Sequence, residues 1–365
     1  MTTLNAQIIE FSNEQHDEDS PLMAGIRAFE TQENSLSSSL EYVCANDIDE
    51  RDEDFNDELV ERVLGSDGMS VIYGDSNSGK TFLAIDLSCA IARGVSWQGQ
   101  RTDCGAVLYM ATEGYGSVRN RIKAYKKQYQ ASDMPVYVVR SPVNFFDGDA
   151  DALQVVKLIQ DIEIKHGQKI KLVVGDTMAR ISTGANENSG QDMGMVIKHA
   201  EMVRDIGMVH FLWIHHCGKD AARGMRGWSG FRAFVDTEIE VAEIPGNPVR
   251  SVEITKQRDG EGKGDRYGFT LHPVTIGTNK WGETRSTCVV IPDEAPDKPK
   301  SKTKNAGLLE RAISVAGTNQ KEKVRAIYYE LHTGTPAARK KAFSRAWELY
   351  MNMSCQTEDS YVNET

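Results

Sequence analysis

The sequence predicts an α/β fold: a twisted, mostly parallel sheet with helices on both faces, an antiparallel hairpin at its end, and a small C-terminal helical unit. From Phe55 onward, apolar runs alternate with segments of helical periodicity, which is typical of a parallel sheet covered on both faces. The runs lie roughly 30 to 40 residues apart, a spacing that indicates right-handed βαβ crossovers. Two later runs flank the turn-rich segment Arg258–Gly262, which predicts the hairpin.

The elements are expected in the following order along the chain. Short apolar runs predict strands at Met69–Tyr73, Ala106–Ala111, Val136–Val139, Lys171–Gly175, Val209–His215, Thr237–Val241, Val249–Thr255 and Asp265–Leu271. Apolar residues at helical spacing predict helices at Lys80–Arg93, Tyr115–Gln130, Ala152–His166 and Gly190–Ile206. The C-terminal unit is expected to contain helices at Leu308–Val315, Lys321–Leu331 and Pro336–Tyr350. The last of these has a basic side formed by Arg339, Lys340, Lys341 and Arg345, and an apolar side formed by Ala342, Phe343, Ala346 and Leu349.

Charge divides the chain into regions. The formal net charge is -11, but residues 1–58 contain 16 acidic and 2 basic side chains, whereas residues 298–350 contain 4 and 12. Low apolar content and high like charge predict a disordered acidic arm at 1–54. It is either a solubilising tail or an arm that competes with DNA or docks a basic partner. The predicted regions that follow are an α/β core at 55–291, a Pro/Lys linker at 292–305, a basic helical unit at 306–353 and an acidic tail at 354–365.

Composition argues against several classes of protein. No stretch approaches 18 consecutive apolar residues, and Met1–Glu18 is polar and acidic, so neither a transmembrane helix nor a signal peptide is expected. The six cysteines are scattered without a Cys-x-x-Cys pair, which argues against a zinc site or a disulfide framework. We therefore expect a soluble protein of the cytoplasm.

Residues 74–81 form a complete phosphate-binding P-loop between an apolar run and an amphipathic helix. Its glycines permit a backbone path that aims consecutive N–H groups at phosphates, Lys80 reaches the β and γ oxygens, and the Thr81 hydroxyl can bind Mg²⁺. The alternative is a Gly/Ser-rich turn that happens to hold a lysine, and the flanking strand and helix argue against it. The predicted nucleotide contacts are Gly74, Asp75, Ser76, Asn77, Ser78, Gly79, Lys80 and Thr81.

Two carboxylates follow apolar strands at positions that suit catalysis. The strand Lys171–Gly175 is followed directly by Asp176. This is the Walker B form, and it predicts that Asp176 is a ligand in the Mg²⁺ shell. Many strands end in Asp at a turn, but this one follows a P-loop. Glu113 follows Ala106–Ala111, and a carboxylate at the carboxyl end of a parallel strand points into the ligand crevice, where it can activate water. The alternative for Glu113 is an exposed loop position.

Further candidates lie later in the chain. His215 and His216 end a strand that should neighbour the Walker B strand, where an imidazole can hydrogen-bond the γ-phosphate. A metal role is not expected, because no nearby Cys/His spacing supplies further ligands. The segment after them is cationic and glycine-rich, which suits a nucleic-acid backbone. Its basic residues are Lys219, Arg223, Arg226 and Arg232.

Lys256 and Arg258 end a strand at the predicted hairpin, where the active site of a neighbouring subunit could receive both charges. The alternative is a solvated hairpin tip with two basic residues.

A series of motifs in this order resembles the RecA-like ATPases of phages and plasmids, the RepA-type hexameric replicative helicases. The matching segments are Gly74–Thr81, Val107–Gly114, Leu172–Thr177, Trp213–Lys219 and Thr255–Gly260. The resemblance covers about Leu59 to Val290. Two features depart from it: Gly175 replaces a bulky apolar residue before Asp176, and the acidic N-terminal extension is unusual.

The resemblance implies a RecA-like core, a homohexameric ring with ATP and Mg²⁺ between subunits, and single-stranded DNA threaded through the centre. It implies that Glu113 is the general base and His216 the γ-phosphate sensor. In related bacterial helicases a Lys-x-Arg pair supplies the fingers that act on a neighbour, which would be Lys256 and Arg258 here. In some RepA-like members the finger lies in the arginine loop, which would point to Arg226, and the sequence leaves this choice open.

The predicted function is therefore an ATP-hydrolysing motor on single-stranded DNA, most specifically a replicative hexameric DNA helicase. The alternatives are a RecA-like recombinase or mediator that forms filaments, and a non-motor replication scaffold switched by ATP. The basic C-terminal helices are expected to grip DNA or to dock a primase, initiator or loader. No membrane partner is expected.

Overall fold

The computed structural model describes residues 44–47, 58–218, 225, 227–297 and 304–359. The chain divides into two units between Phe55 and Asn56. In the first unit only residues 44–47 are described, and Ala45–Asp47 (η1) forms a 3-10 turn there. The rest of the predicted acidic arm lies outside the described residues, so its predicted disorder stays a prediction.

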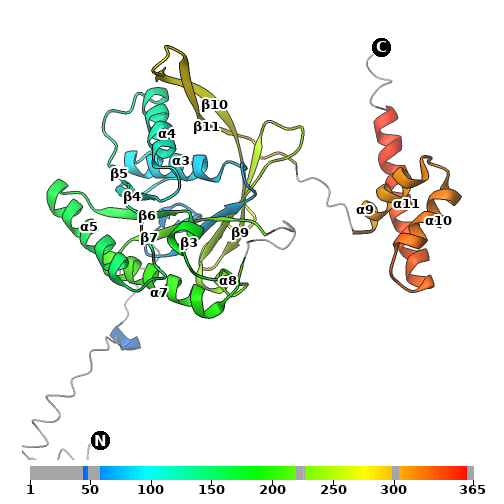
Figure 1. Cartoon of the computed structure of the whole chain (residues 1–365), viewed down its shortest axis with the longest axis horizontal. Coiled ribbons are helices and arrows are strands. Elements are labelled where there is room, and N and C mark those ends of the chain that lie inside the picture. The colour runs from blue at the N-terminus through cyan, green and yellow to red at the C-terminus, as the bar shows by residue number, and fades with distance from the viewer. Residues whose placement is uncertain (1–43, 48–57, 219–224, 226, 298–303, 360–365) are drawn as a thin grey trace, which may run out of the picture. The chain divides into compact units, whose positions relative to one another are not determined.

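A nine-stranded sheet forms the centre of the described core (Figure 1). Its strands lie in the order β11-β10-β9-β8-β3-β7-β6-β4-β5, and the neighbours from β8 to β5 run parallel whereas β9, β10 and β11 run antiparallel. The strand bounds are β3 Met69–Gly74, β4 Ala106–Ala111, β5 Val136–Val139, β6 Ile170–Asp176, β7 His210–His216, β8 Thr237–Ala242, β9 Arg250–Gln257, β10 Arg266–Thr278 and β11 Thr284–Asp293. The predicted α/β class with a terminal antiparallel hairpin is confirmed.

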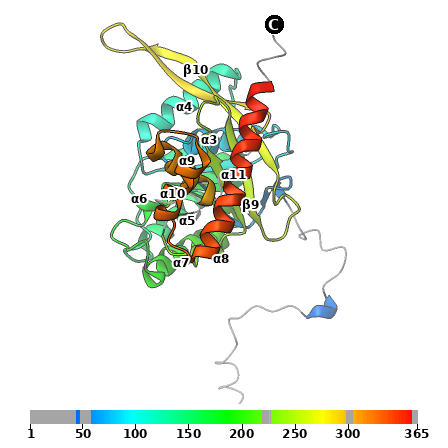
Figure 2. The same cartoon turned by 90° about the vertical axis from the view of Figure 1, so that its right-hand side faces the viewer.

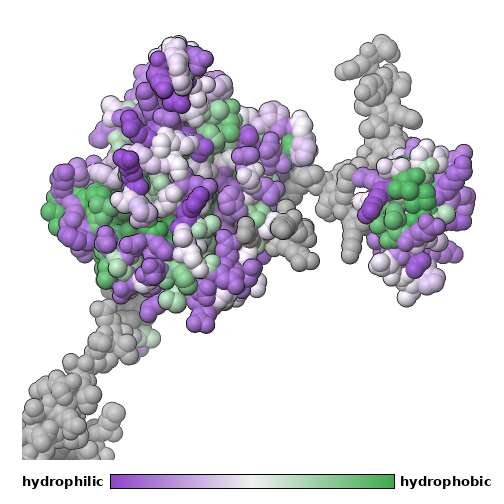
Figure 3. Space-filling model, in the orientation of Figure 1, coloured by the Kyte–Doolittle hydropathy of each residue, from purple (hydrophilic) through white to green (hydrophobic). Residues whose placement is uncertain are grey.

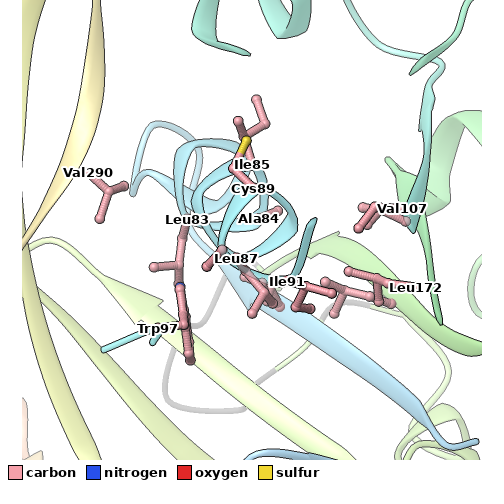
Figure 4. Packing of buried hydrophobic residues seen from close by; sticks show 14 of the residues in the cluster. Leu83, Ala84, Ile85, Leu87, Cys89, Ile91, Trp97, Val107, Leu172 and Val290 are labelled. Atoms are coloured by element: carbon pink, nitrogen blue, oxygen red, sulfur yellow. The ribbon is translucent and has the colours of Figure 1, made fainter. Parts of the chain in front are cut away.

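Helices cover both faces of this sheet because its central strands bury side chains on both sides. One apolar cluster packs α3 (Lys80–Arg93) and α4 (Tyr115–Gln128) on one face, and a second packs α5 (Ala150–His166) and α7 (Gly190–Gly207) on the other. Successive residues of β6 alternate between the clusters, since Leu172 lies in the first and Val173 in the second. Figure 4 shows residues of α3 lying with Val107 and Leu172 of the sheet.

The sequence missed elements that lack a clear apolar period. Two short strands, β1 (Glu58–Val60) and β2 (Leu64–Gly65), form a separate antiparallel pair before the P-loop strand. β10 continues beyond its predicted end at Leu271 to Thr278. β11, which was not predicted, pairs with β10 and ends at Asp293. Pro292 therefore belongs to a strand and not to the start of the linker that was predicted from residue 292. β11 is an edge strand of the sheet, where a proline without an N–H is tolerated.

Gly175, the departure noted before the Walker B aspartate, has a packing reason. It pairs with Trp213 of β7 across the sheet. A Cβ added at Gly175 would lie 3.0 Å from both Ile181 Cδ1 and the Trp213 ring. The bulk usual at this position is thus supplied by the indole of the neighbouring strand.

The C-terminal unit consists of α9 (Lys304–Ala316), α10 (Lys321–Leu331) and α11 (Pro336–Asp359) around their own apolar core. The predicted apolar side of the last helix is confirmed at Ala342, Phe343 and Ala346, and the side chain of Leu349 is not described. Arg339 departs from the predicted basic side. It is half-buried and donates to the carbonyl oxygens of Tyr329 and Gly334 at 3.0 and 2.7 Å.

α11 also extends to Asp359, beyond the predicted end of the unit at residue 353. Within the described residues, no helix combines the length and apolar character needed to cross a membrane.

Candidate nucleotide-binding site

The carboxyl ends of the parallel strands bring four of the predicted site residues to one edge of the sheet. The P-loop leaves β3 at Gly74 and enters α3 at Lys80. His216 at the end of β7 is directly paired with Gly74, and Asp176 at the end of β6 is paired with Ala111, two residues before Glu113. Phosphate-binding backbone, a Walker B carboxylate and a second carboxylate therefore share one crevice, where ligands bind in open α/β sheets.

Both ends of the P-loop require glycine for steric reasons. A Cβ at Gly74 would lie 2.1 Å from the Val241 carbonyl oxygen of β8. Gly79 has φ 102°, and a Cβ there would lie 2.9 Å from the ring of Phe269. The glycines thus let the loop pass close to β8 and β10 while its N–H groups stay at the start of α3.

Lys80 and Ser78 place a buried ammonium group and a buried hydroxyl group at this loop. Lys80 is 5% exposed, and its Nζ donates to the carbonyl oxygens of Gly74 and Asp75 at 3.0 and 2.6 Å. Burial lowers the pKa of Lys80, but nearby carboxylates oppose this shift. Ser78 Oγ is buried and has no hydrogen-bond partner among the described residues. A polyphosphate would supply acceptors for both groups, so the loop fits a nucleoside triphosphate.

Asp176 is a buried carboxylate beside the P-loop helix. It is 1% exposed, accepts a hydrogen bond from Tyr109 Oη at 2.7 Å on its Oδ2, and is also hydrogen-bonded by Thr81. Burial raises the pKa of Asp176 to about 6, against the lowering effects of the Tyr109 hydrogen bond and the Arg121 charge. At neutral pH the carboxylate is mostly ionised, as a cation ligand must be.

The donor set at this edge fits Mg²⁺. Among the residues that the structure describes, no cluster of three or more His, Cys, Asp or Glu side chains could hold a metal alone. Mg²⁺ is usually bound by one or two protein oxygens together with substrate phosphates and water. Thr81 and Asp176 supply such oxygens, so these residues would hold the ion with the nucleotide.

Glu113 is exposed at the same edge, and Thr177 Oγ1 donates to its Oε2 at 3.0 Å. The backbone N–H groups of Thr112 and Glu113 donate to the Asp176 carbonyl oxygen at 3.0 and 3.2 Å. These bonds fix the segment after β4 against the segment after β6. Glu113 therefore has a defined position next to Asp176 while its carboxylate remains open to solvent.

Three supporting side chains were missed by the sequence reasoning: Tyr109, Thr177 and Arg121. Arg121 of α4 lies with its Cζ 3.8 Å from the Phe82 ring centroid, and its Nε is buried without a hydrogen-bond partner among the described residues. Tyr109 and Thr177 lie inside motifs that were recognised, but their bonds cross between strands. Only the order β6-β4 makes these pairs neighbours, so no local pattern could have revealed them.

The loops that follow β6 and β7 contact each other. The Trp228 N–H donates to the Glu187 carbonyl oxygen at 2.7 Å, and a Cβ at Gly190 would lie 3.0 Å from the Trp228 ring. Trp228 thus links the described end of the loop after β7 to the loop after β6 and to the start of α7. The predicted nucleic-acid contacts Lys219, Arg223 and Arg226 lie outside the described residues.

Arg232, the fourth predicted nucleic-acid contact, has an internal partner. It forms an ion pair of 2.9 Å with Glu238, whose side chain is 2% exposed. Burial raises the pKa of Glu238, and the Arg232 and Lys256 charges lower it. Arg232 thus neutralises a buried carboxylate, and its predicted role toward nucleic acid stays a prediction.

Lys256 and Arg258 lie where the parallel strands β3 and β8 begin, whereas the P-loop of the same chain lies at the carboxyl ends of these strands. Lys256 Nζ donates to the carbonyl oxygen of Arg232 at 2.6 Å. Arg258 forms an ion pair of 2.6 Å with Asp236, whose other carboxylate oxygen accepts from the Met69 N–H at the start of β3. β3 separates Met69 from Gly74 by about 17 Å of strand. Neither charge can therefore reach the nucleotide site of its own subunit.

A family model described as an AAA domain matches residues 37–222, just over half of the chain. The chain belongs to this AAA domain family. Membership agrees with the P-loop fold and indicates an ATPase that binds nucleotide and drives its activity with ATP. The AAA match begins inside the predicted acidic arm, includes Lys80, Glu113, Asp176 and His216, and ends before Arg226. No curated protein matches the sequence.

Proposed function

We propose that this AAA protein is an ATP-hydrolysing ring motor on single-stranded DNA, most specifically a replicative hexameric DNA helicase of phage or plasmid type. One observation carries the proposal: the candidate catalytic groups are divided between the two ends of the parallel strands of one sheet. The P-loop, Glu113, Asp176 and His216 share one end, whereas Lys256 and Arg258 lie at the other. A site completed by a neighbouring subunit requires a head-to-tail contact, which closes into a ring when the rotation permits.

The residues divide the work of hydrolysis. Lys80 and the loop N–H groups would bind the phosphates, and Thr81 and Asp176 would hold Mg²⁺, whose charge would offset that of the phosphates. Glu113, held by Thr177, orients the attacking water and accepts its proton. Lys256 and Arg258 of a neighbouring subunit would stabilise the charge that develops on the transferred phosphoryl group. Arg226 is the alternative finger.

Force transmission would begin at His216. A γ-phosphate bound to this imidazole in one state and absent in the next would shift the segment that follows it. The contact of Trp228 with Glu187 supports joint movement of the loops Ala179–Asn188 and Lys219–Arg232, which we propose contact DNA. The C-terminal unit would add a DNA contact or dock a primase, initiator or loader.

A forked-duplex assay tests the motor function directly. We expect ATP-dependent displacement of one strand and a hexamer in mass measurements with ATP and single-stranded DNA. A stable hexamer that unwinds no fork would contradict the helicase proposal and favour the ATP-switched scaffold. Filaments that exchange strands without unwinding would instead favour the recombinase.

Mixing two inactive variants tests the shared site. Glu113→Gln lacks the base but keeps its fingers, whereas Arg258→Ala lacks a finger but keeps its base. In mixed rings, an interface with the base of one variant and the finger of the other is complete, so we expect ATPase activity well above that of either variant alone. The matched mixture of Glu113→Gln with Arg226→Ala distinguishes the two candidate fingers. Full activity of Arg258→Ala alone would rule out this residue as the finger.

A further inference from the structure

The hairpin of β10 and β11 carries a surface that the nucleotide site does not use. In both cartoon views it projects beyond the sheet beside α4 (Figures 1 and 2). Lys127 Nζ of α4 donates to the Thr275 carbonyl oxygen of β10 at 2.8 Å, and Tyr129 Oη donates to the Val290 carbonyl oxygen of β11 at 3.1 Å. Helix and hairpin therefore form one continuous face.

This face is basic in a chain whose net charge is negative. α4 has no acidic residue, and its exposed basic residues are Arg119, Lys123, Lys126 and Lys127. The hairpin adds exposed Lys280 and Arg285 near its tip, and residues 271–290 contain a single carboxylate, Glu283. The projecting end is coloured as predominantly hydrophilic surface in Figure 3. Such a concentration of positive charge attracts a polyanion.

The tip is a structured turn that presents one aromatic side chain. Asn279 Oδ1 accepts hydrogen bonds from the backbone N–H groups of Trp281 and Glu283, both at 2.9 Å. Asn279 Nδ2 donates to Glu283 Oε2 at 2.7 Å, and Gly282 adopts φ 80°. Glu283 is thus engaged within the turn, and these bonds fix the backbone position of Trp281.

Trp281 is 74% exposed, although a tryptophan gains more than most side chains from burial. Its ring lies 4.4 Å from Lys280 Nζ, measured to the ring centroid. An exposed aromatic beside cations matches the two components of single-strand binding: stacking of bases and pairing with phosphates. The isolated ring offers too little apolar area for a stable protein interface, which needs a contiguous patch.

We propose that the face formed by α4 and the β10–β11 hairpin is a second binding site for single-stranded DNA. A base stacks on Trp281, and phosphates lie along Lys280, Arg285, Lys123 and Lys126. The site is formed by residues other than those of the proposed DNA loops after β6 and β7, and it does not depend on ATP hydrolysis. It extends the proposed motor function by holding a strand at the periphery of a subunit.

Photo-crosslinking locates this contact independently of DNA binding elsewhere. An oligothymidine containing 5-iodouracil is irradiated with the full chain, and the linked peptide is identified by mass spectrometry. We expect a crosslink at position 281 in the natural chain and in Trp281→Phe, and none in Trp281→Ala. ATPase activity without DNA should be the same in all three proteins. Stacking of one base predicts that Trp281→Ala weakens oligothymidine binding at this site about 10-fold.

Charge reversal supplies the second arm of the experiment. The double variant Lys123→Glu with Lys126→Glu should reduce the crosslink yield. It should also make the negative slope of log association constant against log salt concentration shallower by about 1 to 2. Lys157→Glu is the matched control, because its exposed side chain lies on α5, and it should change neither quantity. Crosslinks confined to residues 179–188 and 217–232 would overturn the proposal. So would a Trp281→Ala variant that keeps DNA binding but loses oligomer mass, because the face would then join subunits.

The results separate this site from the proposed function. A crosslink at Trp281 in a protein that unwinds no fork supports the second site and refutes only the helicase. Unwinding without a crosslink at Trp281 supports the helicase and refutes only the second site.

Discussion

Replacing Glu113 with glutamine is expected to lower kcat for ATP hydrolysis by about 10²- to 10⁴-fold, the usual contribution of a general base. The amide keeps the size of the side chain and can still accept the Thr177 hydrogen bond on its oxygen, but it cannot take a proton from water. ATP binding should be kept, because the contacts of Lys80 and Thr81 are unchanged. Single-turnover hydrolysis and equilibrium binding of a fluorescent ATP analogue measure the two effects separately.

A matched control for this variant is Glu330→Gln, an exposed glutamate of α10 in the C-terminal unit, which should hydrolyse ATP normally. Normal turnover by Glu113→Gln would contradict its assignment as the base. Loss of ATP binding together with turnover would indicate that Glu113 positions the nucleotide instead.

The variant Asp86→Asn is expected to stabilise the core strongly at alkaline pH. Asp86 of α3 is 8% exposed among apolar side chains, and burial raises its pKa from 3.8 to about 7 against the opposing effect of the Trp97 indole. The folded state thus binds the proton more tightly than the unfolded state does. The cost of the buried charge is absent below the unfolded pKa and grows as pH rises toward 7, to the order of 4 kcal/mol.

Urea unfolding at pH 8 and pH 5 measures this effect. The gain in free energy of unfolding from Asp86→Asn should be largest at pH 8 and should fall by about 1.4 kcal/mol for each pH unit between pH 7 and pH 4. Asp161→Asn provides the control, because its carboxylate is 58% exposed in a surface pair with Lys157. A gain that does not change with pH would contradict this prediction, because it would mean that the pKa of Asp86 is the same in the folded and unfolded states.

Much of the central fold could be predicted because its signals are local. The P-loop helix and β4 have the predicted bounds, since apolar period and flanking glycines mark them without reference to other strands. The hairpin region was predicted only in part. β11 is an edge strand with one exposed face and a proline, so its composition resembles a linker more than a buried strand.

The candidate site divides in the same way. Motif spacing singled out Lys80, Asp176 and Glu113, because each stands at the end of a recognisable strand or loop. It could not identify Tyr109 as the donor to Asp176, or Thr177 as the donor to Glu113, since both bonds join strands whose adjacency depends on sheet order. Arg232 was predicted from charge alone, and its pairing with buried Glu238 was visible only once β8 was in place.

The amino-acid sequence by itself determined that this chain has a P-loop core with carboxylates after its strands, because backbone geometry and apolar periodicity are properties of short segments. The tertiary structure alone decided which edge of the sheet each charge occupies. β8 and β9 run antiparallel, so Lys256 and Arg258 end at the edge opposite the P-loop. Because β9 runs in this direction, Lys256 and Arg258 lie too far from the P-loop of their own subunit to act there. This is the reason for proposing a site shared between subunits.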